Sequence, residues 1–337
     1  MKIVIDTLGG DNSPSAMVKG AISAQKESDF DIALVGRRAD IEEVLSTLEY
    51  DSGRVEIVDA EDEIDCNEPP VEAIKKKPNS SIVKAVKMLK EDEEAKALVS
   101  SGSTGAVLTA AVLLTKRIAG VNRPALSPIL PTMKGNGAML LDCGANVDCK
   151  PINLVQFAVM GSVYMREVLK VENPRVALLS NGVEDNKGCA LTKEAFALLK
   201  EEKSINFVGN MEAREILSGD YDVIVTDGFA GNIALKTIEG TAKCITKTLK
   251  DVIKDSKSAM FGSLFMKKAF RNLKDFLDYN KRGGAVFLGM QQVLVKAHGA
   301  ANEESFKNAV LQAYGASKLD ISDKIKEGLE QLGGENR

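Results

Sequence analysis

Small polar side chains and glycines follow several short apolar stretches of this sequence. Serine, threonine and asparagine side chains offer hydrogen-bond donors, and glycines let backbone N–H groups approach a ligand closely. Such groups suit an anion, above all phosphate. One glycine-rich segment would carry little weight, because turns need glycine anyway. Five such segments after five apolar stretches predict a polar ligand site, and they are residues 6–11, 100–105, 142–146, 181–188 and 227–232.

Three common enzyme motifs are absent from the sequence. Gly102 and Gly105 have the wrong spacing for the dinucleotide motif G-x-G-x-x-G, and Gly135-x-Gly137 lacks the third glycine. There is no phosphate loop of the form G-x-x-x-x-G-K-[ST] and no G-x-S-x-G serine elbow. An anion-binding enzyme that needs no covalent nucleophile fits the remaining residues best.

The polar segments need a scaffold that brings them together, and the sequence pattern predicts one. Short apolar stretches without alternation are typical of strands buried on both faces. Longer segments with helical spacing separate them, so we expect an α/β fold with a doubly wound, mostly parallel sheet. In such sheets ligands bind beyond the carboxyl ends of the strands, which is where the polar segments lie. The predicted strands include residues 2–6, 31–35, 54–58, 97–100, 139–142, 175–180, 206–208 and 222–226.

Two predicted helices, residues 104–114 and 153–169, are apolar on nearly all sides. Such a helix is buried either in the core of the protein or in the interface of a dimer. The pattern favours the core, and the dimer interface is the alternative.

The composition excludes several functional classes. The 337 residues include 44 Lys and Arg, 48 Asp and Glu and one His, for a net charge of −4. We therefore expect no nucleic-acid binding, and His298 alone cannot supply a multi-histidine metal site. The five cysteines form no C-x-x-C pair, no signal-peptide pattern begins the chain, and no apolar run is long enough to span a bilayer. We expect a cytoplasmic protein.

Several segments together resemble the bacterial phosphate acyltransferase family of phospholipid synthesis. The resemblance covers almost the whole chain in the same order. The segments that carry it are residues 6–11 (DTLGGD), 101–106 (SGSTGA), 141–149 (LDCGANVDC), 155–162 (VQFAVMGS), 186–188 (NKG), 191–196 (LTKEAF), 206–210 (NFVGN), 227–236 (DGFAGNIALK) and 296–299 (KAHG).

The resemblance implies an activity and partners. A long-chain fatty acyl group would pass from acyl carrier protein to inorganic phosphate, giving acyl phosphate and free carrier protein. A membrane glycerol-3-phosphate acyltransferase would then use the acyl phosphate. The resemblance also implies a single domain over residues 1–337, a homodimer, no required metal or cofactor, and a fold similar to the isocitrate/isopropylmalate dehydrogenases and phosphotransacetylases. A phosphotransacylase for short-chain acyl-CoA and a carrier-protein-binding scaffold without chemistry are the alternatives.

Lys187 and Asn232 are the catalytic residues that the resemblance implies. Phosphate is already an anion at neutral pH, so its attack on a thioester needs positioning and oxyanion stabilisation more than a general base. Lys187 would supply a positive charge and Asn232 an amide donor. The alternatives are a solvated loop lysine for Lys187 and a helix N-cap for Asn232.

Further residues are predicted to bind phosphate or substrate. We interpret the aspartates at the strand ends as residues that orient loops by accepting backbone hydrogen bonds, rather than as metal ligands. His298 either lines the site or has a structural hydrogen bond at the end of a strand. The predicted set is Asp6, Gly9, Gly10, Asp11, Ser101, Gly102, Ser103, Thr104, Gly105, Asp142, Asn146, Asn181, Asp227, Gly228 and His298.

Two positions depart from the family pattern. The first loop of the family usually continues Asp-His, whereas this chain has Asp11-Asn12. The serine loop usually carries Asn where this chain has Ser103. Both residues keep a small polar side chain, so the anion site is expected to survive, but an essential acid–base role at position 12 is not expected.

A basic, phenylalanine-rich segment at about residues 257–278 stands out in this acidic chain. On a helical wheel its apolar residues lie mainly opposite its basic ones. Three interpretations compete: a core helix with a solvated basic face, an amphipathic element at a membrane surface, and a docking face for acidic carrier protein. The resemblance favours an exposed element with peripheral contact to the inner face of the cell membrane, broken at Gly262-Ser263. The predicted contact residues are Phe261, Phe265, Lys267, Lys268 and Arg271.

Overall fold

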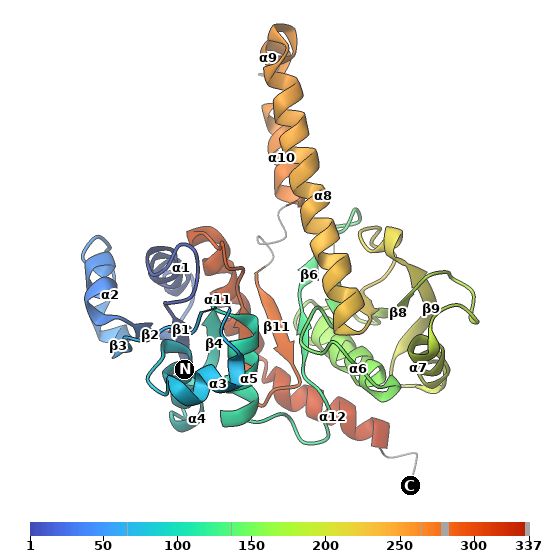
Figure 1. Ribbon diagram of the computed structural model, residues 1–337, viewed down its shortest axis with the longest axis horizontal. Helices are drawn as coiled ribbons and strands as arrows, with labels where there is room; N and C mark the ends of the chain where they lie inside the picture. Colours follow the sequence, from blue (N-terminus) through green and yellow to red (C-terminus); the bar gives the residue numbers. More distant parts are fainter. Residues whose placement is uncertain (66, 136, 264, 278–282, 334–337) are drawn as a thin grey trace.

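The strands of the protein divide between two sheets. The computed structural model describes residues 1–65, 67–135, 137–263, 265–277 and 283–333 (Figure 1). The alternation of apolar stretches and helices predicts the α/β class, which is confirmed, but it does not reveal that the strands form two separate sheets.

The first sheet has seven strands, which include both the first strand of the chain, β1, and the last, β12. Its inner strands pair in parallel, whereas β11 is antiparallel to both of its neighbours. In spatial order the strands are β3 (Val55–Asp59), β2 (Asp31–Gly36), β1 (Lys2–Asp6), β4 (Ala95–Ser100), β12 (Val293–Lys296), β11 (Ala285–Leu288) and β5 (Ala125–Ser127).

The second sheet has five strands, and all of its pairs except β6–β7 are parallel. In spatial order these strands are β6 (Ile129–Leu130), β7 (Ala138–Leu141), β10 (Val223–Val225), β8 (Arg175–Ser180) and β9 (Asn206–Glu212). All eight strands predicted from the apolar stretches are present, and seven of them agree to within about two residues at each end. The predicted strand 206–208 is longer than expected, because β9 continues to Glu212. The strands β5, β6, β11 and β12 were not predicted.

Helices cover both faces of each sheet. Around the first sheet lie α1 (Ser15–Gln25), α2 (Arg38–Leu45) and α11 (Glu303–Lys318) on one face, and α3 (Pro70–Lys76), α4 (Ser81–Glu91) and α5 (Thr104–Leu114) on the other. The second sheet packs against α6 (Pro151–Glu167), α7 (Ala190–Glu201) and α12 (Ile321–Gly333) on one face and the start of α8 (Gly228–Lys254) on the other.

One apolar cluster joins the two sheets into a shared core. It contains Ile3 and Val99 from the first sheet and Met139 and Val176 from the second, all fully buried. Helix α6 lies in this cluster and is buried from Asn153 to Met165, so its interpretation as a core helix is confirmed. The core thereby fixes the two sheets, and the loops at their ends, relative to one another.

Helix α8 leaves this core and projects far beyond it (Figure 1). It continues into α9 (Lys257–Ser263) at the tip and α10 (Lys267–Leu277), which runs back beside α8. We refer to α8, α9 and α10 as the arm. The predicted break at Gly262-Ser263 is confirmed because α9 ends there. Residues 264 and 278 of the predicted segment lie outside the described residues.

The core-helix interpretation of the basic segment is wrong. The side chains of Phe261 and Phe265 are 67% and 81% exposed at the tip of the arm, and Met260 and Met266 are exposed beside them. Within the described residues, no helix combines the length and apolar character needed to cross a membrane.

Candidate functional site

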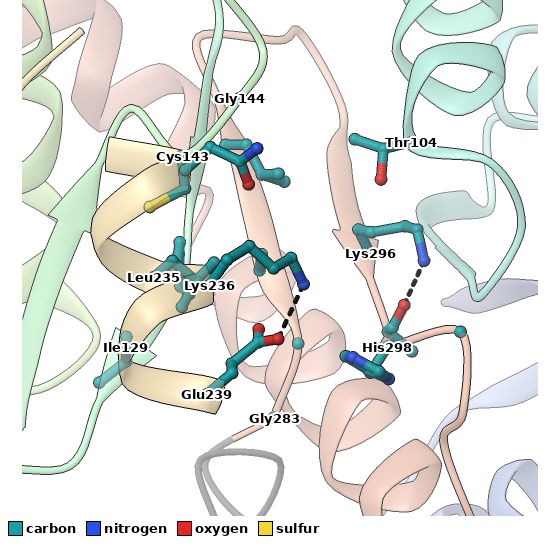
Figure 2. Close-up of a pocket in the computed structure, with 17 residues that line it drawn as sticks. Thr104, Ile129, Cys143, Gly144, Leu235, Lys236, Glu239, Gly283, Lys296 and His298 are labelled. Atoms are coloured by element: carbon teal, nitrogen blue, oxygen red, sulfur yellow. Dashed lines mark hydrogen bonds and ion pairs between the residues drawn. The ribbon is translucent and has the colours of Figure 1, made fainter. Parts of the chain in front are cut away.

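A cavity of about 320 Å³ opens between the two sheets where the arm begins (Figure 2). Its walls come from distant parts of the chain: the start of α5, the strands β5 and β6, the loop after β7, the first turns of α8, the start of β11, and the end of β12 with the loop after it. The lining residues are Thr104, Leu126, Pro128, Ile129, Cys143, Gly144, Asn232, Leu235, Lys236, Glu239, Gly283, Gly284, Ala285, Lys296, Ala297, His298 and Gly299.

Helix α8 supplies one wall of this cavity. Asp227 caps the helix, and its carboxylate accepts hydrogen bonds from the backbone N–H groups of Phe229 and Ala230, each at 2.9 Å. Asn232, Lys236 and Glu239 follow at intervals of four and three residues, so they lie on one face of the helix. The sequence of α8 therefore presents an amide, a cation and a carboxylate to the cavity.

Lys236 and Glu239 form an ion pair in the cavity (Figure 2). The Lys236 Nζ lies 2.8 Å from the Glu239 Oε2. The Glu239 side chain is 7% exposed and that of Lys236 is 57% exposed. Removing Lys236 would leave the buried Glu239 carboxylate without this partner, which is unfavourable. The ion pair also holds the Lys236 side chain against the cavity wall.

The opposite wall follows β12 and carries a second lysine. The Nζ of Lys296 donates hydrogen bonds to the backbone carbonyl of Ser101, at 3.0 Å, and to that of Ala297. These bonds hold the ammonium group between the loops that follow β4 and β12. Thr104 begins α5 on the same side, after Ser103, whose hydroxyl caps that helix.

His298 lies half-buried at the end of this wall. Its Nδ1 accepts a hydrogen bond from the backbone N–H of Ala300 at 3.0 Å. Burial lowers the pKa of His298 below its ordinary value, in spite of the Glu239 carboxylate nearby, which raises it. The neutral imidazole is favoured, with its proton on Nε2 because Nδ1 accepts a hydrogen bond. His298 thus both has a structural hydrogen bond and lines the cavity.

The third wall is the loop after β7, which Asp142 organises. Its buried carboxylate accepts hydrogen bonds from the backbone N–H groups of Leu126, Ala145 and Asn146 and from the Asn146 side chain, at 2.7–3.1 Å. Burial nevertheless raises the pKa of Asp142. These bonds fix Gly144 at φ +120°, where the Asn232 amide lies over it within van der Waals distance of a Cβ built there. A Cβ would fit at this distance, so the positive φ rather than a lack of space favours glycine at this position.

The loop-orienting interpretation of the strand-end aspartates is confirmed for Asp6, Asp142 and Asp227, because each accepts backbone hydrogen bonds from its own loop.

Burial raises the pKa of the Cys143 thiol well above its ordinary value. A thiol with a raised pKa is a poor nucleophile. Cys143 is the one thiol among the described residues that line the cavity.

The structure brings only part of the predicted set to this cavity. Thr104, Asn232 and His298 line it. Asp6, Gly9, Gly102 and Ser103 instead line a separate small cavity of about 10 Å³. The remaining predicted residues line neither cavity within the described chain: Gly10, Asp11, Ser101, Gly105, Asp142, Asn146, Asn181, Asp227, Gly228 and Lys187.

Lys187 lies on the exposed loop between β8 and α7, where its backbone N–H donates to the Glu184 carbonyl at 3.0 Å. Its catalytic role stays a prediction. The alternative interpretation of Asn232 as the N-cap is wrong, because Asp227 caps α8 and Asn232 lies in the second turn.

The chain is similar to known proteins over nearly its whole length. A model of the family described as "Fatty acid synthesis protein" matches residues 1–324. A phosphate acyltransferase of Clostridium novyi (strain NT) is 48% identical over 332 residues, covering 98% of this chain and 99% of its own. A phosphate acyltransferase of Dictyoglomus thermophilum is 44% identical over 332 residues, with 98% of both chains covered. This chain belongs to the phosphate acyltransferase family. It is therefore an acyltransferase.

Solved structures support the fold of this family member. A phosphotransacetylase from Streptococcus pyogenes superposes with a TM-score of 0.63 at 15% identity, and the EutD phosphotransacetylase from Staphylococcus aureus with 0.60 at 17%. Each comparison covers 94% of both chains. The predicted similarity to the phosphotransacetylase fold is confirmed.

Lys236, Glu239 and Lys296 are cavity residues that sequence reasoning did not single out. Lys236 and Lys296 lie in segments that carry the family resemblance, at 227–236 and 296–299. The signal that was available is helical spacing, since positions four and seven residues after Asn232 share its face of the helix. Glu239 lies just beyond the segment 227–236, and no other feature of the sequence pointed to it.

We expect the stability of the acyltransferase to depend on Asp6 between about pH 4 and pH 6. Burial raises the pKa of this carboxyl from 3.8 to about 6, although the Ser100 hydroxyl donates to it at 2.7 Å. The folded state therefore binds more protons than the unfolded state in this range, and the free energy of unfolding should fall by up to about 3 kcal/mol as the pH rises through it. Urea unfolding at pH 4.5 and pH 7 would measure this, and Asp6→Asn should flatten the slope. An unchanged slope in that variant would rule out Asp6 as the cause.

Proposed function

We propose that the protein transfers a long-chain fatty acyl group from acyl carrier protein to inorganic phosphate. The products are acyl phosphate and free acyl carrier protein, for use in phospholipid synthesis. The observation that carries this proposal is the cavity between the sheets, where Lys236, Lys296, Asn232 and the neutral His298 converge. Cations and neutral donors of this kind suit a phosphate and a developing oxyanion.

The chemistry balances without a covalent enzyme intermediate. An oxygen of hydrogen phosphate attacks the thioester carbonyl carbon, the carbon–oxygen bond forms, and the carbon–sulfur bond breaks. The proton of hydrogen phosphate ends on the thiolate that leaves. Attack therefore depends on how phosphate and thioester are held, which is the kind of catalysis that positioning supplies.

Residues on the different walls of the cavity have different roles in binding phosphate and in stabilising the oxyanion. Lys296, held by two backbone carbonyls, has a fixed position for attracting the phosphate. The Asn232 amide is a neutral donor for the oxyanion of the tetrahedral intermediate. The Nε2–H of His298 adds a second donor. Thr104 contributes a hydroxyl at the start of α5, which is a favourable place for an anion.

A comparison of acyl donors tests this proposal. Palmitoyl carrier protein, palmitoyl-CoA and acetyl-CoA would each be incubated with the protein over a range of phosphate concentrations. We expect phosphate-dependent release of carrier protein and a product that hydroxylamine traps, with the palmitoyl carrier protein as the best donor. A preference for acetyl-CoA would favour a short-chain phosphotransacylase. Binding of carrier protein without any turnover would favour a scaffold.

We extend the proposal to the tip of the arm, which we expect to contact the membrane surface peripherally. The rings of Phe261 and Phe265 pack edge to face at 5.9 Å and remain exposed. Lys267, Lys268 and Arg271, which follow them in the chain, are exposed as well. Exposed aromatic rings next to basic side chains are typical of helices that lie on anionic membranes. An interfacial position would suit transfer of acyl phosphate to a membrane glycerol-3-phosphate acyltransferase.

Liposome flotation tests this contact. The double variant Phe261→Asp/Phe265→Asp is expected to lose most of its flotation with anionic vesicles, while it keeps its activity on soluble donors. Because both side chains are exposed and leave the core untouched, its thermal stability should match that of the parent chain. Flotation equal to that of the parent chain would refute membrane contact by this tip.

We also propose that the protein forms a homodimer. Ile245 and Val252, seven residues apart on one side of α8, are apolar and exposed. An apolar stripe of this kind is typical of a helix that packs against a partner. Sedimentation equilibrium should give a dimer for the parent chain and a shift toward monomer for Ile245→Asp.

A further inference from the structure

Helix α8 carries a row of exposed lysines along one side. At 3.6 residues per turn, their positions fall within an arc of about 60° around the helix axis. Neither of the two acidic residues of α8, Glu239 and Asp251, has its position inside this arc. We refer to this row as the lysine stripe, and it consists of Lys236, Lys243, Lys247, Lys250 and Lys254.

The stability of the helix does not account for the lysine stripe. Lys243 and Lys247 are four residues apart, and like charges at this spacing repel one another and destabilise a helix. Among the residues that the structure describes, Lys236 is the one member of the stripe with an ion pair. The chain as a whole has a net charge of −4. A local surface of uncompensated positive charge in such a chain indicates attraction of an acidic partner.

The lysine stripe begins at the cavity between the sheets. Lys236 lines the cavity, and Lys243 follows two turns further along α8. The pKa of His298 in the cavity is lowered mainly by burial and further by the charges of Lys236, Lys296 and Lys243, so Lys243 is electrostatically close to the cavity. At about 1.5 Å per residue, Lys243 and Lys247 lie about 10 Å and about 16 Å along the helix from Lys236. A partner that binds these two lysines therefore lies beside the cavity.

The lysine stripe and the proposed dimer contact lie on different sides of α8. Each lysine position is at least about 140° around the helix axis from those of Ile245 and Val252. An acidic partner on the stripe and a second copy of the chain at Ile245 can therefore bind at the same time.

We infer that Lys243 and Lys247 form the docking surface for the acidic carrier protein that delivers the acyl thioester. This inference rests on the proposed function and assigns a surface to its macromolecular substrate. Charged groups at such a surface raise the rate of encounter and orient the partner. The carrier protein would dock beside the cavity, while its flexible prosthetic group brings the thioester to Asn232 and Lys296.

The position of the two lysines favours the carrier protein over an anionic membrane. Lys243 lies eleven residues, about 16 Å, before the end of α8, and the tip of the arm lies beyond that end (Figure 1). Electrostatic attraction to a charged membrane falls off within a Debye length, which is about 8 Å at physiological ionic strength. A membrane that contacts Phe261 and Phe265 would therefore attract Lys243 only weakly.

Charge reversal at the two positions tests the inference. The variant is Lys243→Glu/Lys247→Glu, and the matched control is Lys87→Glu/Lys326→Glu, which changes the net charge equally at exposed positions of α4 and α12. The donors are octanoyl carrier protein and octanoyl pantetheine, which has the same thioester but no protein, with phosphate in excess. We expect the variant to raise KM for octanoyl carrier protein at least about tenfold, and to leave its kcat and the kcat/KM of octanoyl pantetheine within about twofold. The control should leave both donors unchanged.

Direct binding separates this inference from the proposed function. The unacylated carrier protein cannot react with phosphate, and calorimetry should show it binding the parent chain with an affinity that falls as salt is added. The Lys243→Glu/Lys247→Glu variant should bind it at least about tenfold more weakly, and the control should bind it like the parent chain. A parent chain that makes no acyl phosphate from any donor would refute the proposed function, and the binding result would still decide the docking surface.

Three results would overturn the inference. One is equal losses with octanoyl carrier protein and octanoyl pantetheine, which would show that the lysines act on the cavity rather than on the carrier. Another is an unchanged KM for octanoyl carrier protein. The third is a loss of flotation with anionic vesicles while carrier-protein binding stays the same, which would assign the stripe to the membrane. If the charge reversal folds poorly, the neutral variant Lys243→Gln/Lys247→Gln keeps the test decisive, and it should raise the same KM about threefold.

Discussion

Replacing Asn232 by alanine is expected to lower kcat/KM for phosphate-dependent thioester cleavage by about 100- to 1000-fold, the usual cost of losing one oxyanion donor. The side chain is exposed to the cavity, where its amide lies over the backbone of Gly144. It makes none of the capping bonds of α8, which come from Asp227. The thermal midpoint should therefore stay within a few degrees of that of the parent chain.

The variant Asn232→Asp tests the hydrogen-bond donor of the side chain separately from the shape of the side chain. Aspartate fills the same space but lacks the N–H donor, and it carries a negative charge beside the phosphate. We expect it to be at least as impaired as alanine, and Thr237→Ala, on the exposed surface of the same helix, to be fully active. Steady-state kinetics with saturating donor and varied phosphate would measure all three. Activity of Asn232→Asp close to that of the parent chain would exclude an amide donor at this position.

The second large effect concerns the junction between α8 and the loop after β7. A Cβ at Gly231 would overlap the backbone carbonyl oxygen of Asp142 and would press on the Thr226 side chain. Neither the carbonyl nor the buried helix turn can move far, because Asp142 is bonded into its loop. We expect Gly231→Ala to cost about 3 kcal/mol or more of unfolding free energy and to displace Asn232 from the cavity.

Gly240→Ala is the matched control for this variant. It lies nine positions further along α8, is exposed, and has no atom within 4 Å of the Cβ that alanine would add. There alanine should instead raise the unfolding free energy by about 0.5–1 kcal/mol through its helix propensity. Urea titrations of both variants would give the two opposite signs. Equal effects would contradict the close packing of α8 against the loop after β7.

Local pattern was sufficient to predict most of the fold. Strands such as β1 and β8 are short runs of buried apolar residues, and their bounds follow from the run itself. The strands that were missed, such as β6 with two residues and β5 with three, are too short to give a pattern. The division into two sheets depends on pairing between distant strands, β12 with β4 for example, which no local pattern encodes.

The candidate site was predictable only in part, for a related reason. The rule that ligands bind at the carboxyl ends of strands found Thr104, Asn232 and His298, because each follows a strand or begins a helix. The same rule also selected Asp6, Asp142 and Asp227, which organise loops instead. Glu239 escaped it because the residue lies three turns into α8 and enters the site through the direction of that helix.

The catalytic role of Lys187 stays a prediction. The family resemblance implies a catalytic lysine there, yet the side chain lies on an exposed loop outside the residues that line the cavity. The cavity contains two other lysines, Lys236 and Lys296. Turnover of Lys187→Ala beside Lys296→Ala would decide which cation the reaction needs.

We propose that the cavity between the sheets transfers an acyl group directly to phosphate. Phosphorus NMR of a mixture of palmitoyl carrier protein, inorganic phosphate and the protein would test it most directly, with Asn232→Ala in a parallel tube. We predict an acyl phosphate resonance that grows in step with the released carrier-protein thiol and that is nearly absent for the variant. Thiol release that yields free fatty acid without an acyl phosphate resonance, or equal rates in the two tubes, would contradict the claim.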